Sequence, residues 1–116
     1  MELKVLQPAG GAAAAHVATV SGEVDLHSAP DLRAQLGELL TSTSPSLVLD
    51  LNEVGFLDST GLGALVAART SAGERGGQLA LVCTQQRILK LFTITGLNSV
   101  FTIHPSVDDA LASLAA

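Results

Sequence analysis

One polar turn between a buried strand and an alanine-rich helix constrains this chain most. Residues 47–51 are mostly aliphatic, which predicts a short strand buried on both faces. From Leu62 to Arg69, leucine, valine and arginine recur at helical spacing with alanines between them. A strand therefore gives way to a helix at the sequence Asp58-Ser59-Thr60-Gly61-Leu62-Gly63.

The residue types in this turn predict an accessible hydroxyl at a helix start. The first amides of a helix lack partners within it, and an aspartate such as Asp58 can accept from them as an N-cap. Ser59 would then lie exposed in the first turn, beside the positive end of the helix dipole. Gly61 and Gly63 have no Cβ, so we expect them to leave room beside Ser59 for a large partner.

Length and hydropathy favour one domain over residues 1–116, large enough for its own core. Hydrophobic residues make up 47% of the chain, yet none of its apolar runs approaches the about 18 residues of a membrane span. Glu2 precedes Lys4, and no basic segment leads into a leucine-rich core, which argues against a secretory signal. We expect a cytoplasmic protein that does not bind membranes.

Charge and residue usage argue against several kinds of ligand. The net charge is −5, the six Lys and Arg residues are scattered, and Trp and Tyr are absent, so a nucleic-acid partner is not expected. Cys83 is the only cysteine, which excludes an internal disulfide, and we expect it to be buried. The acidic pairs Asp108-Asp109 and Glu23/Asp25 lack the further ligands of a metal site.

Turn and capping signals divide the chain into alternating strands and helices. A turn at Pro8–Gly11 predicts an antiparallel hairpin, and Ser28 with Asp31, Thr84, and Ser106 with Asp109 are candidate helix caps. Expected strands cover residues 2–6, 16–22, 47–51, 78–83 and 100–104. The predicted fold class is α/β, with a mixed, mostly parallel sheet of about five strands, an antiparallel N-terminal edge hairpin and about four helices.

Ligand sites in such sheets gather at the carboxyl ends of the strands. The segments Glu23-Val24-Asp25 and Asp58–Gly61 each follow a strand and precede a helix. If their strands are parallel neighbours, both segments share one edge of the domain.

The motifs of several enzyme classes do not match this turn. A hydrolase elbow needs a glycine two residues before its serine, where Leu57 stands, and the third glycine of a dinucleotide loop is replaced by Val66. His16, His27 and His104 show no orienting pattern for a catalytic base, and structural or exposed roles are expected for them. The sequence therefore favours a protein that is not an enzyme, with no catalytic residues, cofactor or small-molecule substrate.

A serine that is acted upon remains consistent with the turn. An exposed hydroxyl at a helix start suits in-line phosphoryl transfer from ATP held by another protein. Phosphate would add about −1.5 to −2 charge next to Asp58, and a partner docked over the site would be repelled. The alternative is that Asp58 and Ser59 only cap the helix.

Over nearly its whole length the chain resembles STAS-domain proteins, specifically the small anti-sigma factor antagonists of bacteria. The resemblance rests on Gly22-Glu23-Val24-Asp25, on Leu49-Asp50-Leu51 with Val54 and Phe56 to Gly63, on Leu79–Val82 after a glycine-rich turn, and on Leu91-Phe92 and Gly96-Leu97. It implies a single STAS-like domain. The alanine-rich segment from Ala9 to Ala15 is long for the first hairpin.

The resemblance also implies partner switching. The unphosphorylated antagonist would bind an anti-sigma factor that is a serine kinase, freeing the sigma factor; phosphorylation of Ser59 would end the complex, and a serine phosphatase would reset it. Thr60 is a second hydroxyl beside this phosphoacceptor. The expected partner-binding residues are Glu23, Asp25, Asp58, Thr60, Gly61 and Leu62. The alternative is a non-phosphorylated STAS scaffold or a subunit of a larger signalling or transport assembly.

Overall fold

The computed structural model describes residues 1–6, 15–40 and 45–115. The helices and strands of these segments follow one another as β1 (Glu2–Leu6), β2 (Ala15–Val24), α1 (Ala29–Leu39), β3 (Ser46–Leu57), α2 (Ser59–Glu74), β4 (Leu79–Val82), α3 (Gln86–Ile94), the 3-10 turn η1 (Leu97–Ser99), β5 (Thr102–His104) and α4 (Val107–Ala115). No helix in the described segments is long and apolar enough to cross a membrane.

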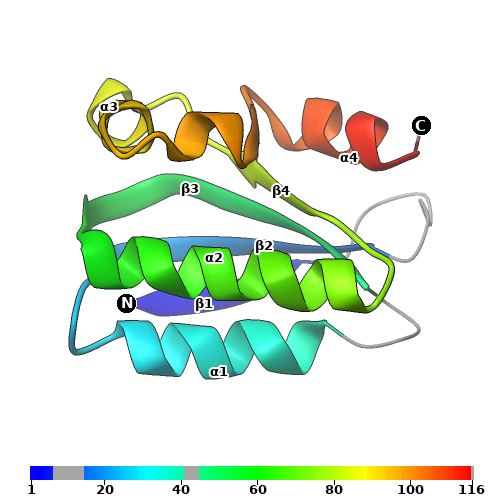
Figure 1. Cartoon of the computed structure of the whole chain (residues 1–116), viewed down its shortest axis with the longest axis horizontal. Helices are drawn as coiled ribbons and strands as arrows, with labels where there is room; N and C mark the ends of the chain where they lie inside the picture. The colour runs from blue at the N-terminus through cyan, green and yellow to red at the C-terminus, as the bar shows by residue number, and fades with distance from the viewer. Residues whose placement is uncertain (7–14, 41–44, 116) are drawn as a thin grey trace.

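The strands form one sheet in the order β1-β2-β3-β4-β5. β1 pairs with β2 antiparallel, and the other pairs are parallel, as the sequence predicted. Figure 1 shows α1 and α2 side by side on one side of the sheet, with α3 and α4 on the other. The parallel crossovers bring the starts of α1 and α2 to the same end of the sheet.

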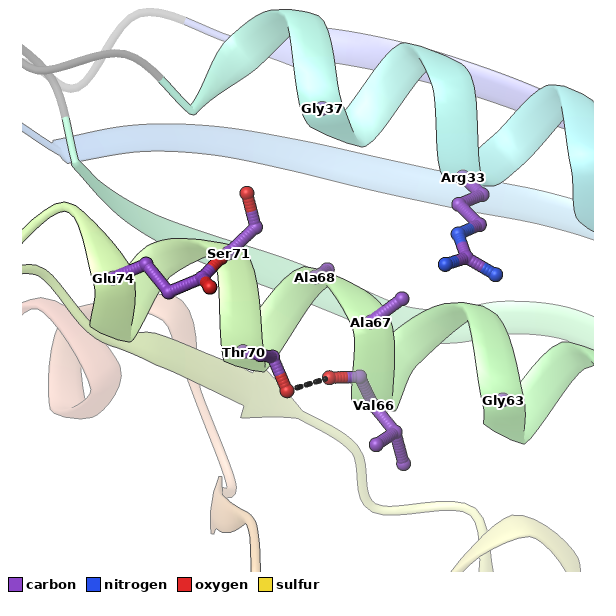
Figure 2. A pocket seen from close by; sticks show the side chains of 9 residues that line it. All are labelled: Arg33, Gly37, Gly63, Val66, Ala67, Ala68, Thr70, Ser71 and Glu74. Atoms are coloured by element: carbon purple, nitrogen blue, oxygen red, sulfur yellow. Dashed lines mark hydrogen bonds between the residues drawn. The ribbon is translucent and has the colours of Figure 1, made fainter.

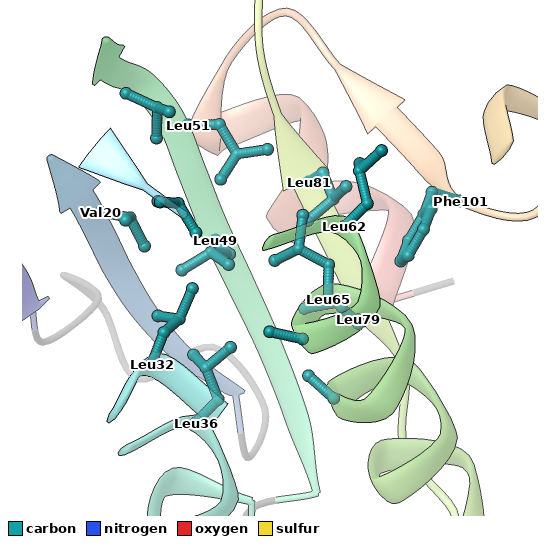
Figure 3. Packing of buried hydrophobic residues seen from close by; sticks show 14 of the residues in the cluster. Val20, Leu32, Leu36, Leu49, Leu51, Leu62, Leu65, Leu79, Leu81 and Phe101 are labelled. Carbon is teal, nitrogen blue, oxygen red and sulfur yellow. The ribbon is translucent and has the colours of Figure 1, made fainter. Parts of the chain in front are cut away.

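Alternate residues of β3 supply the two halves of the core. Leu49 packs with Leu32 and Leu36 of α1 and Leu65 of α2, a cluster shown in Figure 3. Val48, on the opposite face of the strand, packs in the cluster beneath α4. The predicted strand is thus buried on both faces, because helices cover both sides of the sheet.

The central strands are longer than predicted. β3 continues to Leu57 and β2 to Val24, because the two pair along nearly their whole length, with irregularities on either side of Gly22. Glu23 therefore lies within β2, where it pairs with Phe56, instead of starting a loop.

The last predicted strand starts too early. Residues 97–99 form η1 after Gly96, whose φ of 77° ends α3 as predicted, and β5 begins at Thr102. The predicted turn at residues 8–11 and nearly all of the alanine-rich segment lie outside the described residues.

Of the three helix caps predicted outside the polar turn, two are wrong and one is confirmed. Ser28 precedes α1 in an αR conformation without a side-chain cap, and Thr84 bonds to Asn52 of β3 instead of capping α3. In both cases the hydroxyl forms a hydrogen bond with another residue instead of capping the helix. Ser106 accepts from the Asp109 amide at 3.1 Å, as a cap of α4 does.

On the side of β3 that pairs with β4, side chains take the place of a strand as hydrogen-bond partners of the carboxyl-terminal half of β3. β4 pairs with β3 only as far as Asp50, so the following carbonyl groups on that side lack a strand partner. The Gln85 amide donates to the carbonyl oxygens of Asn52 at 2.6 Å and Val54 at 3.1 Å, and Arg87 donates to that of Gly55 at 2.7 Å. These bonds fix the strand that leads into the polar turn.

Candidate functional site

The polar turn is a capped helix start, as predicted. Asp58 is extended, and its Oδ1 accepts from the Gly61 amide at 2.9 Å. The Asp58 amide donates to the Val24 carbonyl oxygen at 3.2 Å, which ties the turn to the end of β2. Ser59 and Thr60 open α2 with exposed side chains. The N-cap is therefore Asp58, and the Ser59 hydroxyl projects from the first turn.

Gly61 and Leu62 face the interior. A Cβ on Gly61 would lie 2.8 Å from the Val24 carbonyl oxygen, and Leu62 is only 5% exposed. Gly61 therefore makes room for β2 and not, as expected, for a partner. Gly63 does match that expectation, since a Cβ there would meet nothing within 4 Å. Direct partner contact by Gly61 and Leu62 stays a prediction, and their burial assigns them to holding the turn.

Asp25 organises the loop between β2 and α1. Its Oδ1 accepts from the amides of His27 at 2.9 Å and Ser28 at 3.1 Å. The Ser28 hydroxyl accepts from the Asp25 amide and donates to the Glu23 carbonyl oxygen at 2.9 Å. The hydrogen bonds to the Asp25 carboxylate, first that from the Ser28 amide, lower its pKa below the ordinary value of 3.8. The loop thus holds a charged carboxylate in a fixed position.

The two acidic loops lie at the same edge of the sheet. Val24 and Leu57 are register partners on the neighbouring parallel strands β2 and β3, and Asp25 and Asp58 are the next residues along each chain segment. Glu23 is exposed one position earlier on β2. The structure therefore brings Glu23 and Asp25 to the edge of the sheet at which the turn with Ser59 begins.

Exposed apolar side chains flank this edge. Leu26, Phe56 and Ile94 are 65%, 49% and 69% exposed. Phe56, Leu91 and Ile94 also line a cavity of about 290 Å³ between the end of β3 and α3. Ile94 is the last residue of α3, which ends beside this cavity.

The remaining candidate metal-binding and nucleophilic groups do not form a second site in the described residues. The described residues contain no group of three or more His, Cys, Asp and Glu that could hold a metal ion. His27 is exposed, whereas Nε2 of His104 is buried without a hydrogen-bond partner in the described structure. Cys83 is buried, as predicted, and desolvation raises the pKa of its thiol.

Comparison with known proteins places this geometry in a family. The model of the STAS domain matches residues 11–110. Anti-sigma-B factor antagonists of Listeria monocytogenes and Bacillus subtilis are each 38% identical over 84 residues, which is 72% of this chain and 74% and 76% of theirs. The crystal structure of an anti-sigma factor antagonist from Mycobacterium paratuberculosis is 31% identical, with a TM-score of 0.82 over 99% of this chain and 96% of that one. The chain belongs to the STAS-domain family, among the anti-sigma factor antagonists.

Proposed function

We propose that this chain is a phosphorylation-controlled anti-sigma factor antagonist. Its unphosphorylated form binds an anti-sigma factor that is a serine kinase, and this binding frees the sigma factor. The kinase phosphorylates Ser59, which ends the complex, and a separate serine phosphatase restores the binding form. The observation that carries the proposal is the exposed Ser59 hydroxyl directly after a cap supplied by Asp58.

The chain supplies only the acceptor oxygen for the transfer. Oγ of Ser59 attacks the γ-phosphorus of ATP held by the kinase, and the bond from this phosphorus to the β,γ-bridging oxygen breaks. ADP leaves with the bonding electron pair, and the hydroxyl proton passes to a base of the kinase. The chain itself needs no catalytic residue or cofactor for this step.

The unphosphorylated surface suits a protein partner. Exposed Leu26, Phe56 and Ile94 provide apolar area around the turn, and Glu23 and Asp25 provide negative charge. We propose that Asp58 and Thr60 lie within the docked area, with Gly61 and Leu62 holding them in place.

Phosphate acts on this surface through charge. It adds about −1.5 to −2 charge beside Asp58 and Asp25, on a chain whose net charge is already −5. A partner that docks over the turn must then bury or face this charge, which costs binding free energy.

Helix capping alone is a weaker account of Ser59. The structure gives the N-cap to Asp58, so the adjacent hydroxyl is not needed for it. The alternative is a STAS scaffold that is never phosphorylated. One experiment distinguishes this scaffold from the phosphorylation switch.

That experiment is intact-mass analysis after incubation with ATP and cognate anti-sigma kinases. We expect one added phosphate in the wild type and in Thr60→Ala, and none in Ser59→Ala. A phosphate that persists in Ser59→Ala and disappears in Thr60→Ala would move the acceptor to Thr60. Absence of phosphate in the wild type with every cognate kinase would favour the scaffold.

A further inference from the structure

A cavity of about 550 Å³ is lined by residues of α1 and α2, and a single arginine projects into it from α1. Figure 2 shows the Arg33 side chain directed across the cavity toward α2, between the positions of Gly63 and Ala67. Arg33 is exposed, so its guanidinium retains reach and rotational freedom. The second and third turns of α2 therefore face a cation carried by the neighbouring helix.

The α2 residues along this cavity place Ser59 at its end. Gly63 and Ala67 line the cavity four residues apart, and Ser59 lies four residues before Gly63. Residues at this spacing share a helix face, about 6 Å apart along the axis. A Cβ at Gly63 would meet nothing within 4 Å, so the space beside Gly63 is open.

The other Lys and Arg side chains do not line the cavity between α1 and α2. Arg75 donates to the Ser71 hydroxyl, and Arg87 donates to the Gly55 carbonyl oxygen. Arg69 lines a cavity with Gly77 and Val100, before the starts of β4 and β5. Lys4 is on the edge strand β1, and Lys90 lines the apolar cavity beside α3. Arg33 is therefore the cation that lies on the side of Ser59 facing α1.

We propose that Arg33 is the intramolecular partner of a phosphate on Ser59. A guanidinium presents parallel N–H donors that match two phosphate oxygens, and such charge-assisted bonds are stronger than neutral ones. The pair holds the phosphate over the groove between α1 and α2. This inference rests on the proposed phosphorylation of Ser59.

Arg33 also keeps the phosphate doubly charged. The titratable groups around this end of the molecule include Glu23, Asp25, Asp58 and His27 at the ends of β2 and β3 and Asp31 of α1. They also include three cations, the Met1 amino group beside Gly22 and the side chains of Arg87 and Lys90, which line a cavity with Leu57. The four carboxylates oppose the second ionisation of the phosphate, whereas a nearby guanidinium favours it. Without Arg33, more of the phosphate would be singly charged near neutral pH, and the repulsion of a partner would be weaker.

The test installs phosphoserine at position 59 during translation and follows the second phosphate ionisation by ³¹P NMR. We expect Arg33→Gln to raise this phosphate pKa by about half a unit, a roughly threefold change in the acid constant, because an exposed charge pair is screened by solvent. Arg33→Lys should restore part of the shift. Added salt should reduce the difference between wild type and Arg33→Gln.

Arg69→Gln is the matched control, because it removes one positive charge from the cavity before the starts of β4 and β5. Equal phosphate pKa values in Arg33→Gln and Arg69→Gln would overturn the proposal. Because the phosphate is installed without a kinase, this result is independent of whether a kinase recognises Ser59. Failure of the kinase reaction would remove the proposed function, and an unshifted phosphate pKa would remove only the role of Arg33.

Discussion

Gly61 lies so close to Val24 that a Cβ on the glycine would come within 2.8 Å of the valine carbonyl oxygen. The same carbonyl oxygen accepts from the amide of Asp58. The start of α2 is therefore pressed against the end of β2, and this contact sets the position of Ser59. Glycine at this position is a packing requirement of the site.

Gly61→Ala should lower the free energy of unfolding by about 1 to 3 kcal/mol, because backbone atoms of β2 must move to admit the methyl group. Gly63→Ala is the matched control, since the space beside it is open; alanine should stabilise that helical position by up to about 1 kcal/mol. Urea unfolding followed by circular dichroism measures both, because the chain has no Trp or Tyr for fluorescence. Equal stabilities of the two variants would refute the packing argument.

Gln85→Ala should destabilise the fold by about 1 to 2 kcal/mol, because it leaves carbonyl groups of β3 without their donor. Gln86→Ala, which removes an exposed neighbour, should change stability by less than about 0.5 kcal/mol. Urea midpoints at a shared denaturant slope give the comparison. A cost for Gln85→Ala no larger than that for Gln86→Ala would show that these bonds do not hold the strand.

The stability contributed by Asp25 should depend on pH. Its pKa is lowered in the folded state, so its carboxylate stabilises the fold above the ordinary value of 3.8, and this stability is lost as pH falls through the folded pKa. Asp25→Asn should be less stable than wild type at pH 7, and the difference should shrink as the pH falls below 3.8. Carboxyl ¹³C NMR titration gives the pKa directly, and a value at or above 3.8 would contradict the hydrogen-bonded loop.

Ile94→Ser should weaken binding to the anti-sigma partner about tenfold while leaving stability almost unchanged, because its side chain is 69% exposed beside the turn. Val100→Ser is the control, since Val100 is 38% exposed but lies next to the start of β5, away from Ser59. Isothermal titration calorimetry with the partner measures both. An equal effect of the two variants would mean that the apolar area around Ser59 is not the docking surface.

Local patterns were enough to predict the turn and the sheet. The change from an aliphatic strand to helical spacing located Ser59 at the start of a helix. Asp58 was predicted as the N-cap of this helix because capping involves residues that are close in sequence. The alternation of strands and helices predicted the parallel pairing that brings Asp25 beside this turn. These features depend on residue order alone.

Contacts between residues far apart in the sequence were not predicted, because no local pattern indicates them. Gln85 reaches Asn52 across 33 positions, and nothing in the spacing of either residue indicates that pairing. Arg33 and Gly63 line one cavity only because α1 and α2 pack side by side. Ile94 is likewise exposed because α3 ends beside the end of β3, and helical periodicity in the sequence does not indicate where that end lies.

The central claim is that a phosphate on Ser59 changes partner binding. The most direct measurement is the dissociation constant of the anti-sigma partner for the unphosphorylated chain and for the chain with phosphoserine encoded at position 59. We predict binding at least about 100-fold weaker for the phosphorylated chain, since like charges at an interface cost several kcal/mol. Ser59→Ala should bind like the unphosphorylated chain, and Ser59→Glu should fall between the two. Equal affinity for the phosphorylated and unphosphorylated chains would contradict the account.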